Sequence, residues 1–99
     1  MKRNLCLVTF CLSLFAAVNV AQAGELRGVV ELFTSQGCSS CPPADAELAR
    51  LTQEGDILTL SYHVDYWNYL GWKDTLSSAA NTERQHGYAR RLGTSSVYT

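Results

Sequence analysis

The fold is decided by residues 28–43, which read GVVELFTSQGCSSCPP. The first six are mainly apolar with one carboxylate, and a turn cluster follows them, so residues 28–33 predict a β-strand. The two prolines suit the first turn of a helix, and residues 44–53 repeat apolar side chains at spacings of four and three. The pattern therefore predicts a strand and then a helix, with a Cys-x-x-Cys pair at their junction.

The rest of the chain continues this alternation of strand and helix. Residues 57–64 alternate apolar and more polar side chains with a period of two, as a second strand does. A helix connects the two strands, so they should be parallel, and an aromatic segment follows at residues 65–72. Residues 81–92 predict a second helix capped by Gly93, and residues 95–99 predict the start of another strand. The expected fold class is α/β, a βαβα portion with parallel strands that is incomplete at the C-terminus.

The first 23 residues differ from the rest of the chain. Lys2 and Arg3 precede an apolar run of 14 residues, and Ala-Gln-Ala stands at positions 21–23, which is the layout of a secretory signal peptide. The run is shorter than the roughly 20 residues of a membrane-spanning helix. We therefore expect residues 1–23 to be a signal peptide. Residues 24–99 should form one exported domain, periplasmic or secreted, that does not span a membrane after cleavage.

The charges of the expected mature chain limit the classes of partner that it can bind, and its cysteine count singles out one pair. Six basic residues stand against nine acidic ones, which argues against nucleic acid as a partner. Of the four cysteines, Cys6 and Cys11 lie in the signal segment, and Cys38 and Cys41 remain. Disulfides persist in exported proteins, so the spacing of this pair decides its interpretation.

Two cysteines separated by two residues at a helix start are typical of a redox pair. The positive end of the helix and nearby backbone N–H groups lower the pKa of a thiol there and favour attack on a disulfide. Cys38 is expected to be the nucleophile, and Cys41 is near enough to attack the mixed disulfide and release the partner. The partners would be thiols or disulfides of proteins or small molecules, with no cofactor. The alternative is a structural staple, but closing so short a loop contributes only about 2 kcal/mol.

The same thiolates also allow a metal-binding interpretation. His63 ends the second strand, and the C-terminal ends of parallel strands share one edge of the sheet, so His63 is expected near the cysteines. Zinc or copper(I) could then be held by Cys38, Cys41, His63 and Asp65. The other interpretation of His63 is a hydrogen-bonded residue that orients the next loop. Covalent haem attachment is excluded because residue 42 is proline rather than histidine.

Two further features have competing interpretations. Glu31 interrupts an apolar strand, and burial would raise the pKa of its carboxyl so that it could accept the proton of Cys41. Alternatively, Glu31 faces water at an edge or pairs with an arginine. The aromatic residues of segment 65–72 could form an apolar platform for an unfolded substrate chain, or they could belong to the core.

The chain also carries several ordered blocks of residues, at 30–45, 62–67, 71–74, 81–85 and 96–99. In these blocks it resembles the exported thioredoxin-like proteins known as domain of unknown function 1223 (DUF1223). The resemblance covers essentially the whole expected mature chain. It implies a thioredoxin-type core for residues 24–99 and a periplasmic setting. Together with the cysteine pair, it predicts an exported thiol–disulfide oxidoreductase.

The sequence departs from this family in one respect. Family members continue past the Val-Tyr-Thr segment into a proline and further strands, whereas this sequence ends at Thr99. The cis-proline loop that packs against the Cys-x-x-Cys of a thioredoxin-type site is therefore not in the sequence. We expect a truncated chain, with a nonfunctional remnant as the extreme case. An exposed sheet edge would favour instability or association with another chain.

Overall fold

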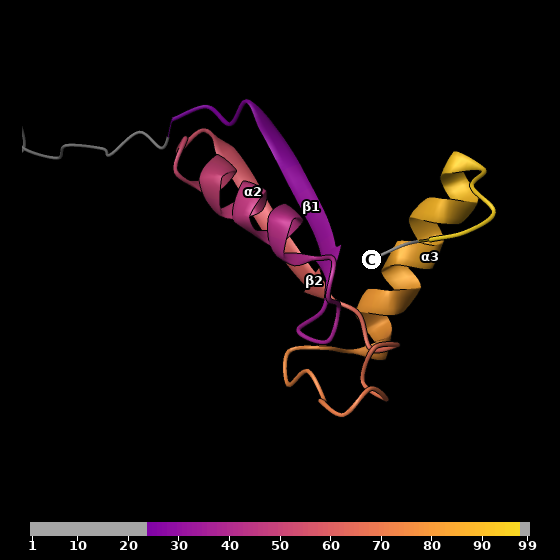
Figure 1. Ribbon diagram of the computed structural model, residues 1–99. Helices are drawn as coiled ribbons and strands as arrows, with labels where there is room; N and C mark the ends of the chain where they lie inside the picture. The colour runs from indigo at the N-terminus through magenta and orange to yellow at the C-terminus, as the bar shows by residue number, and fades with distance from the viewer. Residues whose placement is uncertain (1–23, 98–99) are drawn as a thin grey trace, which may run out of the picture.

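The computed structural model describes residues 24–97, which form two strands and two helices in alternation (Figure 1). In chain order the elements are β1 (Gly28–Thr34), α2 (Pro42–Thr52), β2 (Ile57–His63) and α3 (Ala79–Leu92). The two strands pair in parallel, with Gly28 opposite Ile57 and Thr34 opposite His63. The α/β class and the thioredoxin-like order of parallel strands and helices predicted from the sequence are confirmed.

The boundaries of α3 follow from its capping residues. The helix begins two residues before the expected start because the Ser78 hydroxyl caps it, accepting a hydrogen bond from the Asn81 N–H at 3.1 Å. Gly93 follows the last turn with φ of 68°, a left-handed conformation that glycine adopts without strain. The glycine cap predicted from the sequence is therefore confirmed.

The two helices lie on opposite faces of the strand pair. Because side chains alternate along a strand, Thr34 faces α2, where its hydroxyl donates to Asp45 at 2.7 Å. Phe33 faces the other way, and its ring stacks on Tyr62 at 5.5 Å and meets Tyr88 of α3 edge-on at 6.0 Å. Figure 1 shows α2 alongside the strands and α3 on their other side, rising from the C-terminal ends of the strands.

The interior of the described residues is small and partly polar. Its buried residues are Cys38, Cys41, Val64, Thr34, Ser35, Asp74 and Gln85. All of these except Gln85 lie at the C-terminal ends of the strands or in the segments that follow them. Apolar residues near the strand starts, such as Val29 and Leu58, are exposed. The best-packed part of the chain is therefore the end that carries the cysteines.

The chain ends and the sheet edges concern four further expectations: a C-terminal strand, a signal peptide, the absence of a membrane span and association through a sheet edge. Residues 95–97, expected to start a strand, are irregular because no neighbouring strand pairs with them, and residues 98–99 lie outside the described part. The signal peptide expected at residues 1–23 also lies outside it. Within residues 24–97 no helix is long and apolar enough to cross a membrane. In the same range each strand pairs along one edge, and association through the other edge stays a prediction.

Candidate functional site

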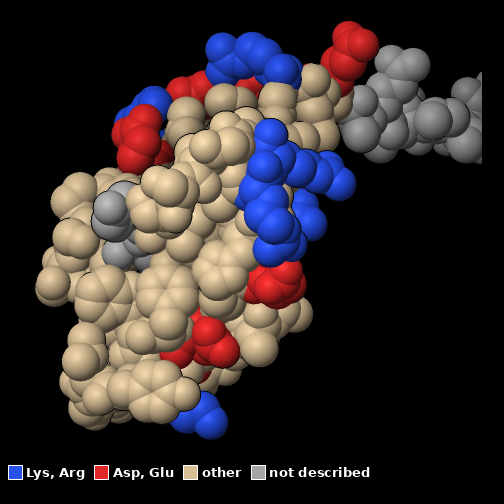
Figure 2. All heavy atoms as spheres, turned by 90° about the vertical axis from the view of Figure 1, so that its right-hand side faces the viewer, with Lys and Arg blue, Asp and Glu red and all other residues tan. Residues whose placement is uncertain are grey.

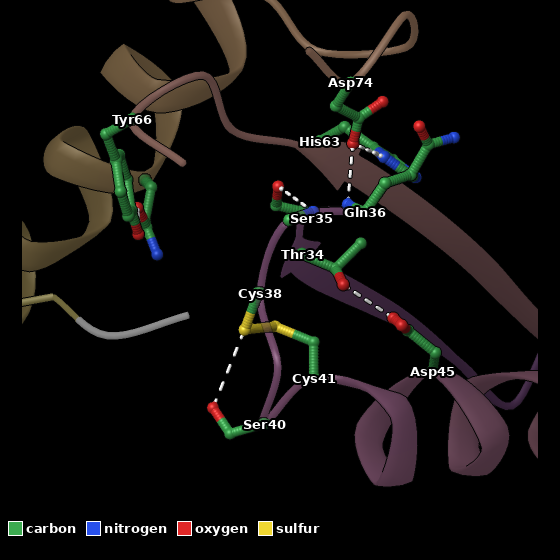
Figure 3. The surroundings of a disulfide bond; sticks show 12 residues. Thr34, Ser35, Gln36, Cys38, Ser40, Cys41, Asp45, His63, Tyr66 and Asp74 are labelled. Atoms are coloured by element: carbon green, nitrogen blue, oxygen red, sulfur yellow. Dashed lines mark hydrogen bonds and ion pairs between the residues drawn. A yellow bond between two sulfur atoms is a disulfide. The ribbon is translucent and has the colours of Figure 1, made fainter. Parts of the chain in front are cut away.

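Cys38 and Cys41 form a disulfide in the segment that joins β1 to α2 (Figure 3). Their Cα atoms lie 5.5 Å apart. Cys41 immediately precedes the first turn of α2, and Cys38 lies one turn of chain earlier. Both residues are buried, with 4% and 6% of their surfaces exposed. The two cysteines thus come together at the strand–helix junction, where the sequence predicts them.

The start of α2 offers a thiolate fewer hydrogen-bond donors than the sequence pattern suggests. Pro42 and Pro43 carry no backbone N–H, so of the first three helical residues only Ala44 has one. The positive end of the helix dipole remains. The Ser40 hydroxyl lies 3.6 Å from Sγ of Cys38 and can donate to it. Ser40, which the sequence does not single out, is therefore placed to donate a hydrogen bond to the sulfur of Cys38.

The segment that leads into Cys38 is held by bonds that do not involve sulfur. The backbone N–H of Gln36 donates to Oδ2 of Asp74 at 2.9 Å. The N–H of Gly37 donates to the Ser35 hydroxyl at 3.0 Å, and the N–H of Cys38 donates to the Ser35 carbonyl at 3.2 Å. These bonds fix the path of the loop independently of the disulfide.

The loop after β2 packs on the segment before Cys38. A Cβ atom at Gly37 would lie 3.1 Å from the carbonyl oxygen of Trp67 and 3.2 Å from its Cβ, so the two backbones approach closely because residue 37 is glycine. The indole N–H of Trp72 donates to the side-chain oxygen of Gln36 at 2.8 Å. The aromatic residues of this loop are therefore partly packing residues of the cysteine loop.

Asp74, which the sequence does not single out, joins the two loops (Figure 3). It is 1% exposed, and its carboxylate accepts hydrogen bonds from the Gln36 N–H, from the Leu76 N–H at 2.8 Å and from Nδ1 of His63 at 2.5 Å. Burial raises the pKa of Asp74, but the bonds from Gln36, His63 and Leu76 outweigh it and hold the pKa below its usual range. The bond from His63 to Asp74 ties the end of β2 to the loop that follows it, as the second interpretation of His63 describes, and the metal-binding interpretation stays a prediction.

A local signal for Asp74 exists, but it is common. Asp74 accepts a hydrogen bond from the N–H of Leu76, two residues later in the chain. Turns of this kind are frequent at aspartate residues. Its bonds to Gln36 and His63 join residues 38 and 11 positions apart, and such contacts leave no periodic pattern in the sequence.

A match to a known protein family covers the strands, the cysteine loop and both helices. Residues 29–99 match the model of a family described as a protein of unknown function, DUF1223. The chain belongs to the DUF1223 family. No curated protein matches it.

The DUF1223 chain is also similar to a solved structure. This is the crystal structure of a protein of Agrobacterium tumefaciens, with 66% sequence identity and a TM-score of 0.73. The similarity covers 80% of this chain and 35% of the solved one. The chain therefore spans about a third of the length of the solved protein that it matches.

Glu31 of this DUF1223 chain lies on the face of the sheet that packs against α3. Its carboxylate accepts hydrogen bonds from the Tyr88 hydroxyl, the Arg84 guanidinium and, at 3.3 Å, the Tyr62 hydroxyl. The bonds from Tyr88 and Arg84 outweigh burial and lower the pKa of Glu31. Of the two interpretations of Glu31, the structure shows the pairing with an arginine. Because α3 supplies the Tyr88 hydroxyl and the Arg84 guanidinium, the shift of the Glu31 pKa is opposite to the rise that burial alone would cause. The role of Glu31 as proton acceptor stays a prediction.

The four donors of the metal-binding interpretation have other partners in this DUF1223 chain. The two cysteines are bonded to each other, and His63 is bonded to Asp74. The Asp65 carboxylate accepts from the Thr82 hydroxyl at 2.6 Å. Across residues 24–97, no three residues among His, Cys, Asp and Glu lie close enough together to hold a metal ion.

A pocket of about 240 Å³ lies between α2 and the C-terminal ends of the strands. It is lined by Ser35, Gln36, Asp45, Leu48, Ser61 and His63. Its walls carry hydroxyl, amide, carboxylate and imidazole groups with one apolar side chain. This part of the DUF1223 fold therefore has room for water or a small polar molecule next to the cysteine loop.

Proposed function

We propose that this DUF1223 chain is a thiol–disulfide oxidoreductase that works through Cys38 and Cys41. The proposal rests on a closed cysteine pair in a loop that other bonds already hold. A reversible pair needs a frame that keeps its two sulfurs close after the bond opens. The bonds to Asp74 and Ser35 hold the backbone at Cys38, and the bond from the Cys41 N–H to the Cys38 carbonyl ties the second cysteine to it, so together they supply such a frame.

A purely structural disulfide explains this arrangement less well. A bond that closes a loop of four residues contributes about 2 kcal/mol through chain entropy. The Cys41 N–H already donates to the Cys38 carbonyl at 3.4 Å across the same four residues, and the N–H groups of residues 36–38 hold the segment before them, so the disulfide adds little further restraint. A pair placed before a helix start is instead in a position that activates thiols.

The exchange can be written as two balanced steps. A partner thiolate attacks Sγ of Cys38, the Cys38–Cys41 bond breaks, and Cys41 leaves as a thiolate that takes up a proton. A second thiolate of the partner then attacks the mixed disulfide, which forms the partner's disulfide and releases Cys38 as a thiolate. Two electrons pass from the partner to the pair, and the reverse sequence oxidises the pair. Because both cysteines are buried, the partner approaches past the exposed Ser39 and Ser40.

Exchange with glutathione tests this proposal. The full chain is equilibrated in glutathione buffers of graded ratio, and free thiols are alkylated and counted by mass spectrometry. Wild type should interconvert between disulfide and dithiol, Cys41→Ser should accumulate a mixed disulfide at Cys38, and Cys38→Ser should not exchange. Absence of exchange in wild type would overturn the proposal. If exchange is absent and the reduced chain binds stoichiometric zinc or copper that His63→Ala loses, the metal-binding interpretation replaces the proposal.

An exported location fits this chemistry, and we propose it for the mature chain. Disulfide exchange proteins work where disulfides persist, outside the reducing cytosol. Mass spectrometry of exported protein should find Gly24 as the first residue. Recovery of peptides from residues 5–20 in that material would contradict the proposal.

A further inference from the structure

The loop between β2 and α3, residues 64–78, buries the carboxylate of Asp74 and leaves four large apolar side chains more than half exposed. Asp74 is buried, and the Asn68 amide donates to the Ser77 hydroxyl at 2.9 Å. The exposed fractions of its apolar residues are 90% for Tyr69, 69% for Leu70, 60% for Trp72 and 63% for Leu76. Exposed large apolar side chains that gather on one loop are typical of interaction surfaces.

Hydrogen bonds hold this arrangement in place. The Asp74 N–H donates to Oδ1 of Asn68 at 3.0 Å, and the Ser77 hydroxyl donates to the Asp74 carbonyl at 2.7 Å. The Ser78 N–H donates to the His63 carbonyl at 3.2 Å. Turning the apolar side chains inward would break these polar contacts and leave buried groups without partners. The apolar side chains are therefore presented outward by a preformed frame.

The loop that carries the outward apolar side chains packs on the segment just before the cysteine pair. The loop starts where β2 ends, and parallel pairing places the end of β2 beside the end of β1. Trp72 is bonded to Gln36, two residues before Cys38. Figure 1 shows the loop and the cysteine turn at the same end of the strands, and Figure 2, seen from the α3 side, shows a mainly tan surface at that end with some acidic and basic side chains in it.

We propose that a docking surface made of Tyr69, Leu70, Trp72 and Leu76 binds an extended apolar segment of a cysteine-containing polypeptide. This proposal rests on the proposed exchange at Cys38 and Cys41, and it names polypeptides rather than small thiols as the substrate class. Glutathione is small and charged, and it offers little apolar area to such a surface. A polypeptide with apolar residues beside its cysteine can bind the docking surface while its sulfur reaches the pair.

The size of the docking surface favours a peptide segment over a second copy of the chain. Four side chains expose on the order of a few hundred Å², whereas a stable dimer buries about 800 Å² on each partner. The low exposure of Cys38 also favours an extended segment, because a folded partner is too bulky to reach a buried sulfur. Extended binding is the geometry in which a short apolar segment makes the most contact.

The test separates docking from exchange by removing the cysteines. The full chain with Cys38→Ser and Cys41→Ser is titrated calorimetrically with a synthetic nonapeptide. The peptide carries leucine, valine and phenylalanine on both sides of a serine that replaces its cysteine, with terminal lysines for solubility. Tyr69→Ser, Leu70→Ser and Leu76→Ser together should weaken peptide binding at least tenfold. Trp72 is left in place because it bonds to Gln36.

A matched control uses exposed apolar residues away from the loop. Leu26→Ser with Leu92→Ser removes two such side chains and should leave peptide affinity within twofold of the parent. Tyr69→Ser alone, at a side chain with almost no packing, should show part of the loss and guards against misfolding of the triple variant. Exchange of the triple variant, with its cysteines intact, against glutathione should match wild type.

Each alternative gives a different result. Equal peptide affinity in the parent and the triple variant would overturn the docking surface, whatever the exchange activity. A dimer of the parent that the triple variant loses in ultracentrifugation would also overturn it, because the surface would then bind a second copy. Failure of wild type to exchange with glutathione, with peptide binding retained, would overturn the proposed exchange but leave the docking surface standing.

Discussion

Replacing Asp74 with asparagine should be among the most damaging conservative changes in the chain. The side chain keeps its shape but loses its charge and one of its two acceptor oxygens. Oδ2 accepts from Gln36 and His63, and Oδ1 accepts from Leu76, so the new amide NH₂ must face at least one N–H donor. Leaving a buried donor unpaired costs about 1–3 kcal/mol, and the remaining bonds lose their charge assistance. We expect Asp74→Asn to lower the free energy of unfolding by about 3 kcal/mol.

Urea denaturation of the full chain, followed by far-UV circular dichroism, measures this loss. The matched control is Asp45→Asn, because Asp45 is exposed and its carboxylate accepts a bond from the Thr34 hydroxyl. That change should cost about 1 kcal/mol or less. Equal losses in the two variants would show that Asp74 does not hold the loops together, and the reasoning from its burial and three donors would be wrong.

Acid titration gives a second readout for Asp74. Its folded-state pKa lies below the ordinary 3.8, so the carboxylate contributes its full stabilisation above that pH and loses it as the pH falls through the folded pKa. Wild type should therefore lose more stability than Asp74→Asn on acidification below about pH 4. Equal losses of unfolding free energy in wild type and Asp74→Asn as the pH falls below about 4 would contradict the lowered pKa.

Three further predictions concern the surroundings of the pair. Glu31→Gln should lower the free energy of unfolding by about 1 kcal/mol at pH 7, a small value because Arg84 is exposed and solvent screens the pair. The loss should shrink below about pH 4, where the wild-type carboxylate becomes protonated as well. Slower exchange with unchanged stability would instead support Glu31 as the proton acceptor. Gly37→Ala should cost about 1–3 kcal/mol in urea denaturation because its Cβ meets Trp67, whereas Gly28→Ala, with open space around it, should not. Ser40→Ala should slow alkylation of reduced Cys38 at neutral pH a few-fold relative to Ser39→Ala, roughly the effect of one lost thiolate hydrogen bond; equal rates would show that the 3.6 Å contact does not stabilise the thiolate.

The order of elements and the position of the cysteine pair could be predicted from the sequence. Periods of two and of about three and a half residues identify strands and helices, and a helix between two strands implies parallel pairing. The turn cluster and the prolines around Cys38 and Cys41 are local signals for the strand–helix junction. These features depend on contacts between residues close in the chain, which is why the sequence alone determines them.

The partners of the site residues depend on contacts between distant parts of the chain. Alternation along β1 shows that Glu31 and Phe33 share a face, but it does not say that α3 brings Tyr88 and Arg84 to that face, where their bonds lower the Glu31 pKa. Nor does any local pattern reveal that Asp74 bonds to Gln36. Such a bond forms only when the whole fold brings the two groups, far apart in the sequence, within 3 Å of each other. The sequence therefore determined the elements and the cysteine pair, and the tertiary structure decided which charges and donors surround them.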